Sequence, residues 1–240
     1  TYIHFIKGYL NETTTEESKK VLDRLILLSA GSKNRVYLDT IISPSYTSAI
    51  AQVVQLSGIS GKGNNLILFE FSRTDPQNLK EINANYGIVE SAGFDICILN
   101  TSYKSFGYKN ELHIWISPDD YQNANLMILL GYIILGHPDW KKGKIKIFAL
   151  YPEELMEEKR KELMDLIKTG RLPISPSNIS MVPFETENRK NVITKYSADA
   201  DLTLIGFTSD MLKNIEELSE GYQDLGNILF VSANRAKTIN

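Results

Sequence analysis

The chain has 240 residues, with 26 Lys and Arg, 29 Asp and Glu, a formal net charge of −3 and one cysteine. Hydrophobic residues make up 42% and charged residues 23%, a composition typical of a folded globular chain, so wholesale disorder is excluded. A single cysteine excludes a disulfide scaffold and a metal site made of cysteines alone. The negative net charge argues against a nucleic-acid partner, because neutralising phosphates requires a basic surface.

Two features bear on membranes and processing. The longest apolar run, from Leu126 to Leu135, is much shorter than the roughly 20 residues that cross a bilayer. The sequence opens on Thr1 without an initiator Met and without the charged and then apolar segments of a signal peptide. We therefore expect a soluble fragment of a longer protein.

Strand-like and helix-like segments alternate along the first part of the chain. Runs of β-branched and aromatic residues predict strands at residues 2–6, 35–42, 66–71, 95–99 and 111–116. Apolar residues at helical spacing predict helices at residues 13–30, 44–57, 78–91 and 125–135. The first helix should begin at the hydroxyls of Thr13 to Thr15 and end at Gly31. This alternation predicts an α/β fold with mostly parallel sheets and flanking helices.

The same rhythm continues after a boundary that we place near residue 143. Strands are predicted at residues 144–150, 178–182, 202–206 and 227–232, and helices at residues 153–169 and 211–219. The polar stretch from Glu185 to Lys195 reads as a flexible connection. We therefore expect two α/β lobes, at residues 1–143 and 144–240.

A glycine-rich segment from Gly58 to Gly63 resembles a phosphate-binding loop at first sight. Such a loop joins the end of a strand to the start of a helix, where free N–H groups point at the anion. Here the order is helix, glycines and then strand, so the segment falls at the wrong edge of the sheet. We interpret it as a helix end followed by a turn.

Polar residues directly after the predicted strands offer a better ligand site. In open α/β sheets, ligands bind outside the carboxyl ends of the strands. The candidates for a nucleotide or another anion, such as ATP or ADP, are Gly8, Ser72, Arg73 and Ser117. The competing interpretation is that these are ordinary loop residues, since loops are rich in such side chains.

Hydrolytic and metal chemistry finds little support. His4, His113 and His137 do not follow a metal-ligand spacing, and no serine lies in a Gly-x-Ser-x-Gly turn. Cys97 lies between two isoleucines, where burial should raise its pKa and leave it inert. Asp119 and Asp120 read as a solvated turn or helix cap. We expect neither catalysis nor a metal site nor a required cofactor.

Two segments resemble the cytosolic C-terminal domain of cation–chloride cotransporters. The first runs from Ser57 to Phe71 as a glycine-rich turn, Asn64-Asn65 and a hydrophobic strand. The second runs from Glu111 to Leu150 as a strand, an acidic turn, an apolar helix and the segment Trp140-Lys141-Lys142 before a final strand. Ile6-Lys7-Gly8-Tyr9 is also similar to a strand end of that family. Tyr121-Gln122-Asn123 stands where the family has glycines, which fits a distant, prokaryotic member.

The resemblance implies a regulatory domain on the cytoplasmic side of the membrane, following a twelve-helix transporter core. It implies two lobes related to Rossmann-like and universal-stress proteins, assembly into a homodimer, and no transport by the domain itself. Some family members bind adenine nucleotide in the first lobe. The family also has a strand and a helix before the segment that matches Thr1, so we expect an N-terminal βα unit to be missing. The alternatives are a soluble universal-stress-like nucleotide-binding protein and, third, an α/β enzyme.

Overall fold

The structure is a computed structural model of the whole chain. It describes residues 1–30, 36–56, 58, 63–75, 77–169, 174–184, 189–214, 218 and 220–237. The chain divides into two compact units: Thr1–Asn64 with Ala84–Ala92, and Asn65–Asn83 with Gly93–Asn240. Each unit is described by itself below.

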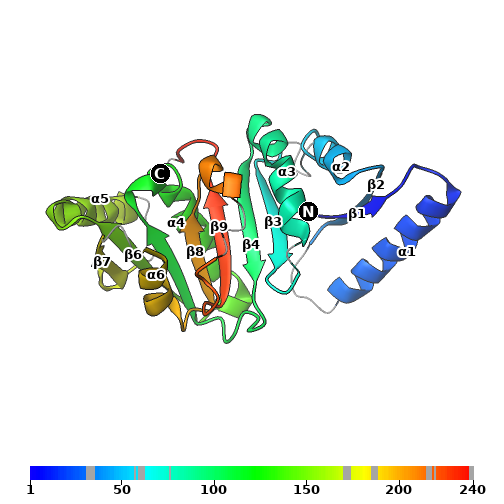
Figure 1. Ribbon diagram of the computed structural model, residues 1–240. Helices are drawn as coiled ribbons and strands as arrows, with labels where there is room; N and C mark the ends of the chain where they lie inside the picture. Colours follow the sequence, from blue (N-terminus) through cyan, green and yellow to red (C-terminus); the bar gives the residue numbers. More distant parts are fainter. Residues whose placement is uncertain are drawn as a thin grey trace. The chain divides into compact units, whose positions relative to one another are not determined.

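The first unit is built on a pair of parallel strands, β1 (Tyr2–Lys7) and β2 (Leu38–Ser43), with Phe5 opposite Ile41. Helix α1 (Glu12–Ser29) packs on β2, and the hydroxyls of Ser18 and Thr40 lie 2.6 Å apart between them. Helix α2 (Tyr46–Val53) begins at the N-cap Ser45. In Figure 1, β1, β2, α1 and α2 of this unit are drawn in shades of blue.

Helix α1 begins earlier than the sequence suggests. Its N-cap is Asn11, whose side-chain oxygen accepts a hydrogen bond from the Thr14 N–H at 3.0 Å. The Thr14 hydroxyl in turn accepts from the Asn11 N–H, which completes a capping box. The prediction of a threonine cap was wrong because an asparagine oxygen reaches the first-turn donors equally well. Its predicted end at Gly31 lies outside the described residues.

The second unit is a seven-stranded sheet in the order β3-β4-β9-β8-β5-β6-β7. Its strands are β3 (Leu66–Ser72), β4 (Asp95–Thr101), β5 (Glu111–Ile116), β6 (Lys144–Tyr151), β7 (Ile179–Pro183), β8 (Leu202–Gly206) and β9 (Asn227–Ser232). Its helices are α4 (Ala124–Leu135), α5 (Met156–Thr169) and α6 (Arg189–Ser197), while α3 (Gln77–Ser91) has residues in both units. The mostly parallel α/β fold predicted from the sequence is confirmed.

One pairing in the sheet is antiparallel. Strand β9 runs parallel to β8, with Leu204 opposite Leu229, and antiparallel to β4, with Ile98 opposite Phe230. Strands β3 and β4 therefore point one way, and β5, β6, β7, β8 and β9 point the other way. The carboxyl ends of the two groups lie at opposite edges of the sheet.

The apolar content of the central strands explains why they are central. Every residue of β8 is buried, and β5 is buried from Leu112 to Ile116, as expected for strands covered on both faces. Helix α4 packs against β5, β6 and β8, with Met127 and Ile128 fully buried. Figure 1 shows α4 and α5 beside these strands. Cys97 on β4 is 1% exposed, and burial raises its pKa to about 12, as its apolar neighbours predict.

The expected lobe boundary does not divide this sheet. Gly143 lies between β5 and β6, yet these strands pair with Glu111 opposite Lys144. The pairing continues through β8 and β9 to β4, so strands from both sides of residue 143 share one core. A repeated βα rhythm along the chain does not reveal which strands will pair.

Two local predictions also need correction. The expected connection at residues 185–195 contains helix α6 from Arg189, and only its residues up to 188 lie outside the described residues. The helix has a polar sequence because only Ile193 and Ser197 are buried in it. Within the expected helix at 211–219, the described residues show a 3-10 segment, Ser209–Asn214, and an α-helical Leu218.

Candidate functional site

The candidate site lies between β5 and β8, where the order of the strands in the sheet changes direction. The five parallel strands follow the order β7-β6-β5-β8-β9, so the chain leaves β5 on one side and returns on the other as β8. In open α/β sheets, ligands bind at the carboxyl ends of the two strands that flank such a switch. Here those ends carry Ser117 to Asp120 after β5, and Gly206 at the end of β8.

Asp120 places a carboxylate inside the protein at this point. Its side chain is 2% exposed, and its Oδ2 accepts hydrogen bonds from the Ser117 N–H at 2.9 Å and the Ser117 hydroxyl at 2.6 Å. Burial raises the pKa of Asp120, and the Ser117 hydrogen bonds and the charge of Arg189 oppose that rise. Of the two predicted alternatives, the solvated turn holds for Asp119, which is 66% exposed, and the helix cap holds for Asp120, whose carboxylate completes a capping box with Ser117.

Glycine and asparagine shape the surroundings of Asp120. A methyl group at Gly206 would overlap Asp120 Oδ1 and come within 3.0 Å of Asn123 Nδ2. Asn123 donates from Nδ2 to the Phe207 carbonyl at 3.2 Å and accepts from the Ala233 N–H at 2.8 Å. The amide therefore ties the ends of β8 and β9 together, and the glycine lets the carboxylate sit against the backbone.

Arg189, the first residue of α6, provides the opposing charge. Its Nη2 lies 3.3 Å from Asp120 Oδ2 and its Nη1 lies 3.6 Å from Asp119 Oδ2. Both distances are long for a charge-assisted hydrogen bond. The side chain is 18% exposed, and its Nε is buried with no hydrogen-bond partner among the described residues.

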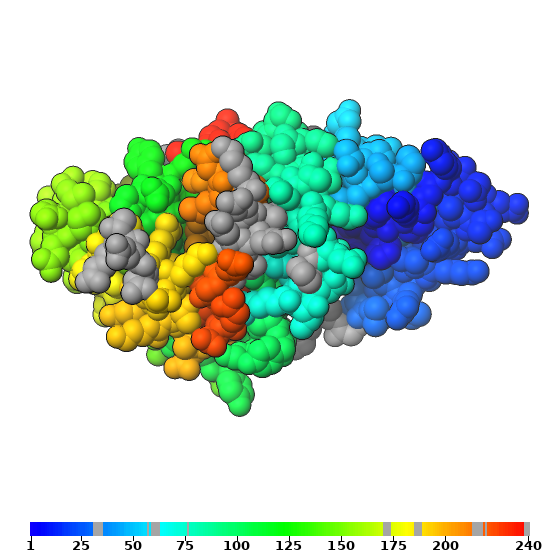
Figure 2. Space-filling model, viewed as in Figure 1, coloured from blue at the N-terminus to red at the C-terminus, as the bar shows by residue number. Residues whose placement is uncertain are grey.

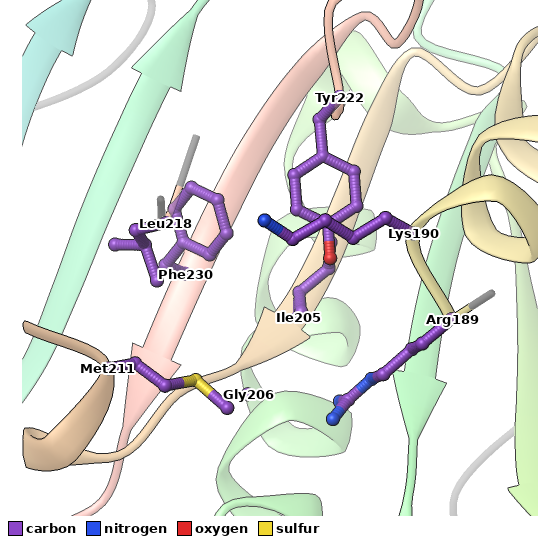
Figure 3. A pocket seen from close by; sticks show the side chains of 8 residues that line it. All are labelled: Arg189, Lys190, Ile205, Gly206, Met211, Leu218, Tyr222 and Phe230. Atoms are coloured by element: carbon purple, nitrogen blue, oxygen red, sulfur yellow. The ribbon is translucent and has the colours of Figure 1, made fainter. Parts of the chain in front are cut away.

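A cavity of about 230 Å³ opens beside this guanidinium (Figure 3). Its lining combines apolar, cationic and aromatic side chains from β8, β9, α6 and the segments around them: Arg189, Lys190, Ile205, Gly206, Met211, Leu218, Tyr222 and Phe230. The Lys190 ammonium lies 5.6 Å from the centroid of the Tyr222 ring. Burial raises the pKa of Tyr222 to about 12, so its hydroxyl remains a hydrogen-bond donor at neutral pH.

The structure separates the residues that the sequence suggests as one ligand-binding edge. Ser72 and Arg73 follow β3, whereas Ser117 follows β5, and these strands end at opposite edges of the sheet. Gly8 belongs to the first unit, where its N–H donates to the Ser43 carbonyl at 2.9 Å. The sequence reasoning assumed a common carboxyl edge, which the antiparallel β4–β9 pairing removes.

Arg73 is engaged within the protein. Its Nε donates to Asn100 Oδ1 at 3.0 Å, and its two terminal nitrogens donate to the carbonyls of Gln223, Leu225 and Gly226 at 2.6–3.2 Å. Burial lowers its pKa. Ser72 Oγ lies 2.8 Å from Thr74 Oγ1. This arginine holds the segment before β9 against the end of β4, which is a structural role. That Gly8, Ser72, Arg73 and Ser117 bind a nucleotide stays a prediction.

The sequence did not identify four residues of this site: Asp120, Arg189, Lys190 and Gly206. Of these, only Gly206 has a position in the sequence from which it could have been recognised. It directly follows the fully buried run Leu202–Ile205, in the fourth of five strands, where a switch point is expected once the strand order is known. Most of the glycine-rich segment from Gly58 to Gly63 lies outside the described residues. Groups of acidic, His and Cys side chains that could hold a metal ion do not occur among the described residues.

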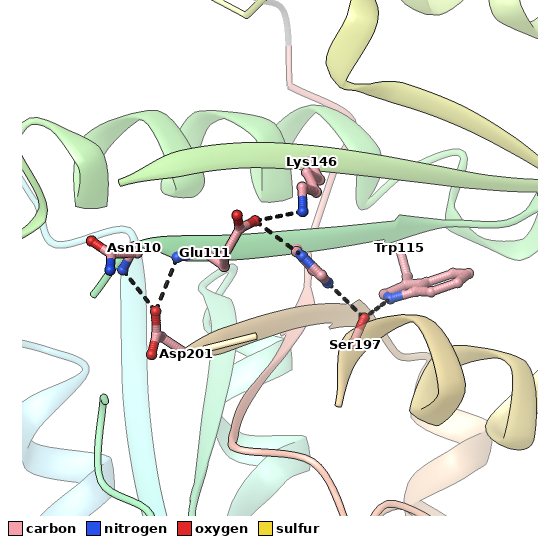
Figure 4. Close-up of polar contacts among 7 residues, drawn as sticks. Asn110, Glu111, Trp115, Lys146, Ser197 and Asp201 are labelled. Atoms are coloured by element: carbon pink, nitrogen blue, oxygen red, sulfur yellow. Dashed lines mark hydrogen bonds and ion pairs between the residues drawn. The ribbon is translucent and has the colours of Figure 1, made fainter. Parts of the chain in front are cut away.

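A second polar array runs from half-exposed side chains at the start of β5 and β6 to buried ones in the core (Figure 4). Lys146 Nζ is 2.9 Å from Glu111 Oε2, which is 3.5 Å from His113 Nε2. His113 Nδ1 lies 2.9 Å from Ser197 Oγ, and Trp115 Nε1 donates to the same oxygen at 2.8 Å. Nearby, Asp201 accepts hydrogen bonds from the backbone N–H groups of Asn110 and Glu111.

Glu111, His113 and Ser197 follow the order carboxylate, imidazole, hydroxyl, as in the catalytic triad of serine hydrolases. Such a triad requires that a substrate can reach the serine hydroxyl. Ser197 is 0% exposed and His113 is 3% exposed, and the rings of Trp115 and Phe148 stack 4.6 Å apart beside them. A nucleophile must reach its substrate, and this hydroxyl is enclosed by packed side chains. The array joins β5, β6 and α6 within the core.

Comparisons with known proteins were made for the sequence and for the fold. No family model matches the sequence, and no curated protein matches it. Among solved structures, the cytoplasmic domain of a prokaryotic cation chloride cotransporter has a TM-score of 0.67 and 14% identity, and the match covers 99% of this chain and 87% of that one.

Two further solved structures are similar in fold. A protein of unknown function from Pseudomonas aeruginosa PAO1 has a TM-score of 0.55 and 15% identity, covering 97% of this chain and 82% of that one. A putative universal stress protein from Pseudomonas aeruginosa UCBPP-PA14 has a TM-score of 0.52 and 15% identity, covering 95% and 81%. At these identities the likeness shows the fold alone, a mostly parallel α/β sheet with flanking helices.

The buried His113 predicts a dependence of stability on pH. Burial lowers its pKa below the ordinary 6.5, and the charge of Lys146 adds to that effect. The unfolded chain therefore binds a proton that the folded chain resists, so the free energy of unfolding should fall as the pH drops below about 6.5. His113→Gln should remove this component, which has a slope of at most about 1.4 kcal/mol per pH unit.

Urea unfolding at a series of pH values between neutrality and mild acid measures the effect. Ile114→Val, on the neighbouring fully buried residue, is the matched control. It should cost about 0.5–1.5 kcal/mol at every pH and keep the slope of the parent chain. An unchanged slope in His113→Gln would show that His113 does not carry the dependence.

Proposed function

We propose that this chain is a non-catalytic cytoplasmic regulatory and dimerisation domain of a membrane cation–chloride cotransporter. The observation that carries the proposal is the fold likeness to the cytoplasmic domain of a prokaryotic cation chloride cotransporter, which extends over 99% of this chain and 87% of that one. A likeness of this extent concerns the arrangement of nearly every element in both domains. The strand–helix–strand run β5-α4-β6 is also the segment whose sequence resembles that family.

The proposal places the transport itself outside this chain. The helices in the described part of the chain do not reach the length and apolar content that a membrane span requires. The domain would act by binding: to the transporter core of the same polypeptide, and to a second copy of itself. Ions would be bound by the transmembrane helices, and this domain would influence assembly and activity.

The complete coding sequence tests the proposal directly. We expect it to continue on the N-terminal side into about twelve apolar segments of roughly 20 residues each, because a helix needs that length to span the hydrocarbon layer. Sequencing the full transcript measures this. A reading frame with no such segments would contradict membership of a transporter and would leave only the fold likeness.

Helix α1 supports the dimerisation part of the proposal. None of its 18 residues is buried, and Ile26, Leu27 and Leu28 in its last turns are 50%, 76% and 71% exposed. Figure 2 shows α1 at the surface in blue. The last turn carries no basic residue, so two copies related by a twofold axis would bring apolar side chains together without placing like charges opposite each other.

Sedimentation over a wide range of concentrations should show a monomer–dimer equilibrium for the purified chain. The double variant Leu27→Glu, Leu28→Glu should weaken the dimer by at least about tenfold, because it puts four carboxylates into the contact. Tyr108→Glu, at a site that is 90% exposed, is the control and should dimerise like the parent. A strict monomer at high concentration would overturn the proposed assembly.

A soluble nucleotide-binding protein of the universal-stress kind is the second candidate function. It is supported by the fold likeness to a putative universal stress protein and by the cationic side chains at the carboxyl edge of β8. This candidate predicts micromolar binding of ATP in titration calorimetry, and much weaker binding of inorganic triphosphate, because the base contributes contacts that charge alone does not. No heat with ATP at millimolar concentration would eliminate it.

A further inference from the structure

The cavity beside Arg189 has two chemically different sides. Apolar side chains of Ile205, Met211, Leu218 and Phe230 line one side, and Arg189 lies at the other (Figure 3). The Lys190 ammonium reaches over the Tyr222 ring between them. Apolar walls with a few convergent polar groups are the usual composition of small-molecule sites. The arrangement suits a ligand that has an apolar body and one charged end.

The donors of Arg189 favour a negative charge at that end. A guanidinium has five N–H groups in a planar fork. In the described residues, its ion-pair partners are Asp120 at 3.3 Å and Asp119 at 3.6 Å, and its buried Nε has no partner. A carboxylate that accepts from Nε and from one terminal nitrogen would form the bidentate pair that such a fork prefers.

The volume of the cavity limits the size of the ligand. At about 230 Å³ it is smaller than the roughly 300–1,000 Å³ of pockets that enclose drug-sized molecules. A nucleoside triphosphate would not be enclosed, whereas a single aromatic ring with a short acidic arm would be. Tyr222 and Phe230 contribute aromatic rings to the lining of the cavity (Figure 3), and aromatic side chains suit such a ring.

We propose that this cavity is a binding site for a small aromatic monocarboxylate. The ring packs between Ile205, Met211 and Phe230, and the carboxylate accepts hydrogen bonds from Arg189. The assignment goes beyond the function proposed above and does not depend on it, because it rests only on the lining of the cavity and on the donors of one arginine.

A ligand at Arg189 leaves the hydrogen bonds between Ser117 and Asp120 in place. Asp120 keeps its two hydrogen bonds from Ser117 when the guanidinium turns toward the cavity, so its buried carboxylate is not left unpaired. Asp119 is 66% exposed and returns to water. The ligand therefore exchanges two long ion pairs for one short bidentate pair.

Titration calorimetry on the whole chain with phenylacetate and with phenylacetamide tests the proposal. The two probes have the same shape and differ in charge. We expect phenylacetate to bind with a dissociation constant of about 1 mM or below, and phenylacetamide to bind at least about tenfold more weakly. Equal binding of both probes, or of neither, would overturn the assignment, and so would tighter binding of ATP in competition with phenylacetate.

Variants then locate the site. Arg189→Gln should weaken phenylacetate binding at least about tenfold and leave phenylacetamide unchanged, and Arg189→Lys should weaken phenylacetate by about threefold because a lysine keeps the charge and loses the fork. Arg160→Gln, which removes the same charge from the exposed side of α5, is the matched control and should bind like the parent. Unchanged phenylacetate binding in Arg189→Gln, with circular dichroism showing a folded chain, would overturn the proposal.

Discussion

The rest of the second unit depends on the placement of β9. This strand is hydrogen-bonded on both sides, parallel to β8 and antiparallel to β4, and is buried from Asn227 to Val231. Its pairing makes the seven strands one sheet and sends the ends of β3 and β4 to the edge opposite that of β5 and β8. Which polar side chains can meet follows from this one strand.

At the edge where β3 and β4 end, polar side chains bind the turn before β9. Asn227 at the start of β9 accepts from the Ser102 N–H at 2.8 Å and donates to the Ser105 carbonyl at 2.7 Å. Arg73 donates to three carbonyls just before β9. Since buried polar groups must find partners, these contacts stabilise the turn into β9 at the end of β4. The nitrogens of Arg73 are therefore already engaged with oxygens of the protein.

The strands can be predicted from the sequence because strands buried in a sheet consist mostly of consecutive apolar residues. The runs around Ile96, Ile114, Ile147, Leu204 and Phe230 are apolar, and each lies in a strand of the sheet. Helix α6 could not be predicted in this way, because only Ile193 and Ser197 of its nine residues are buried and a helix period is not visible in two positions.

The candidate site depended on information that the sequence alone does not carry. Asp120 is buried because Gly206, 86 positions later, lets its carboxylate approach the end of β8, and no local pattern links the two. The direction of β9 relative to β4 likewise follows from tertiary packing. A parallel pairing would have put Ser72, Arg73 and Ser117 at one edge, which is what the strand-end reasoning assumed.

Two arginines in the same sheet show how the same side chain takes different roles. Arg73 donates from all three of its nitrogens to oxygens of the protein, and removing it would take a donor away from three backbone carbonyls before β9. Arg189 has two long ion pairs and a buried Nε without a partner in the described chain. Because an unmade hydrogen bond of a buried charged group costs free energy, a ligand that supplies the missing acceptor recovers that cost on binding. The incomplete pairing of Arg189, rather than its charge alone, is therefore the physical reason to expect a ligand at this edge.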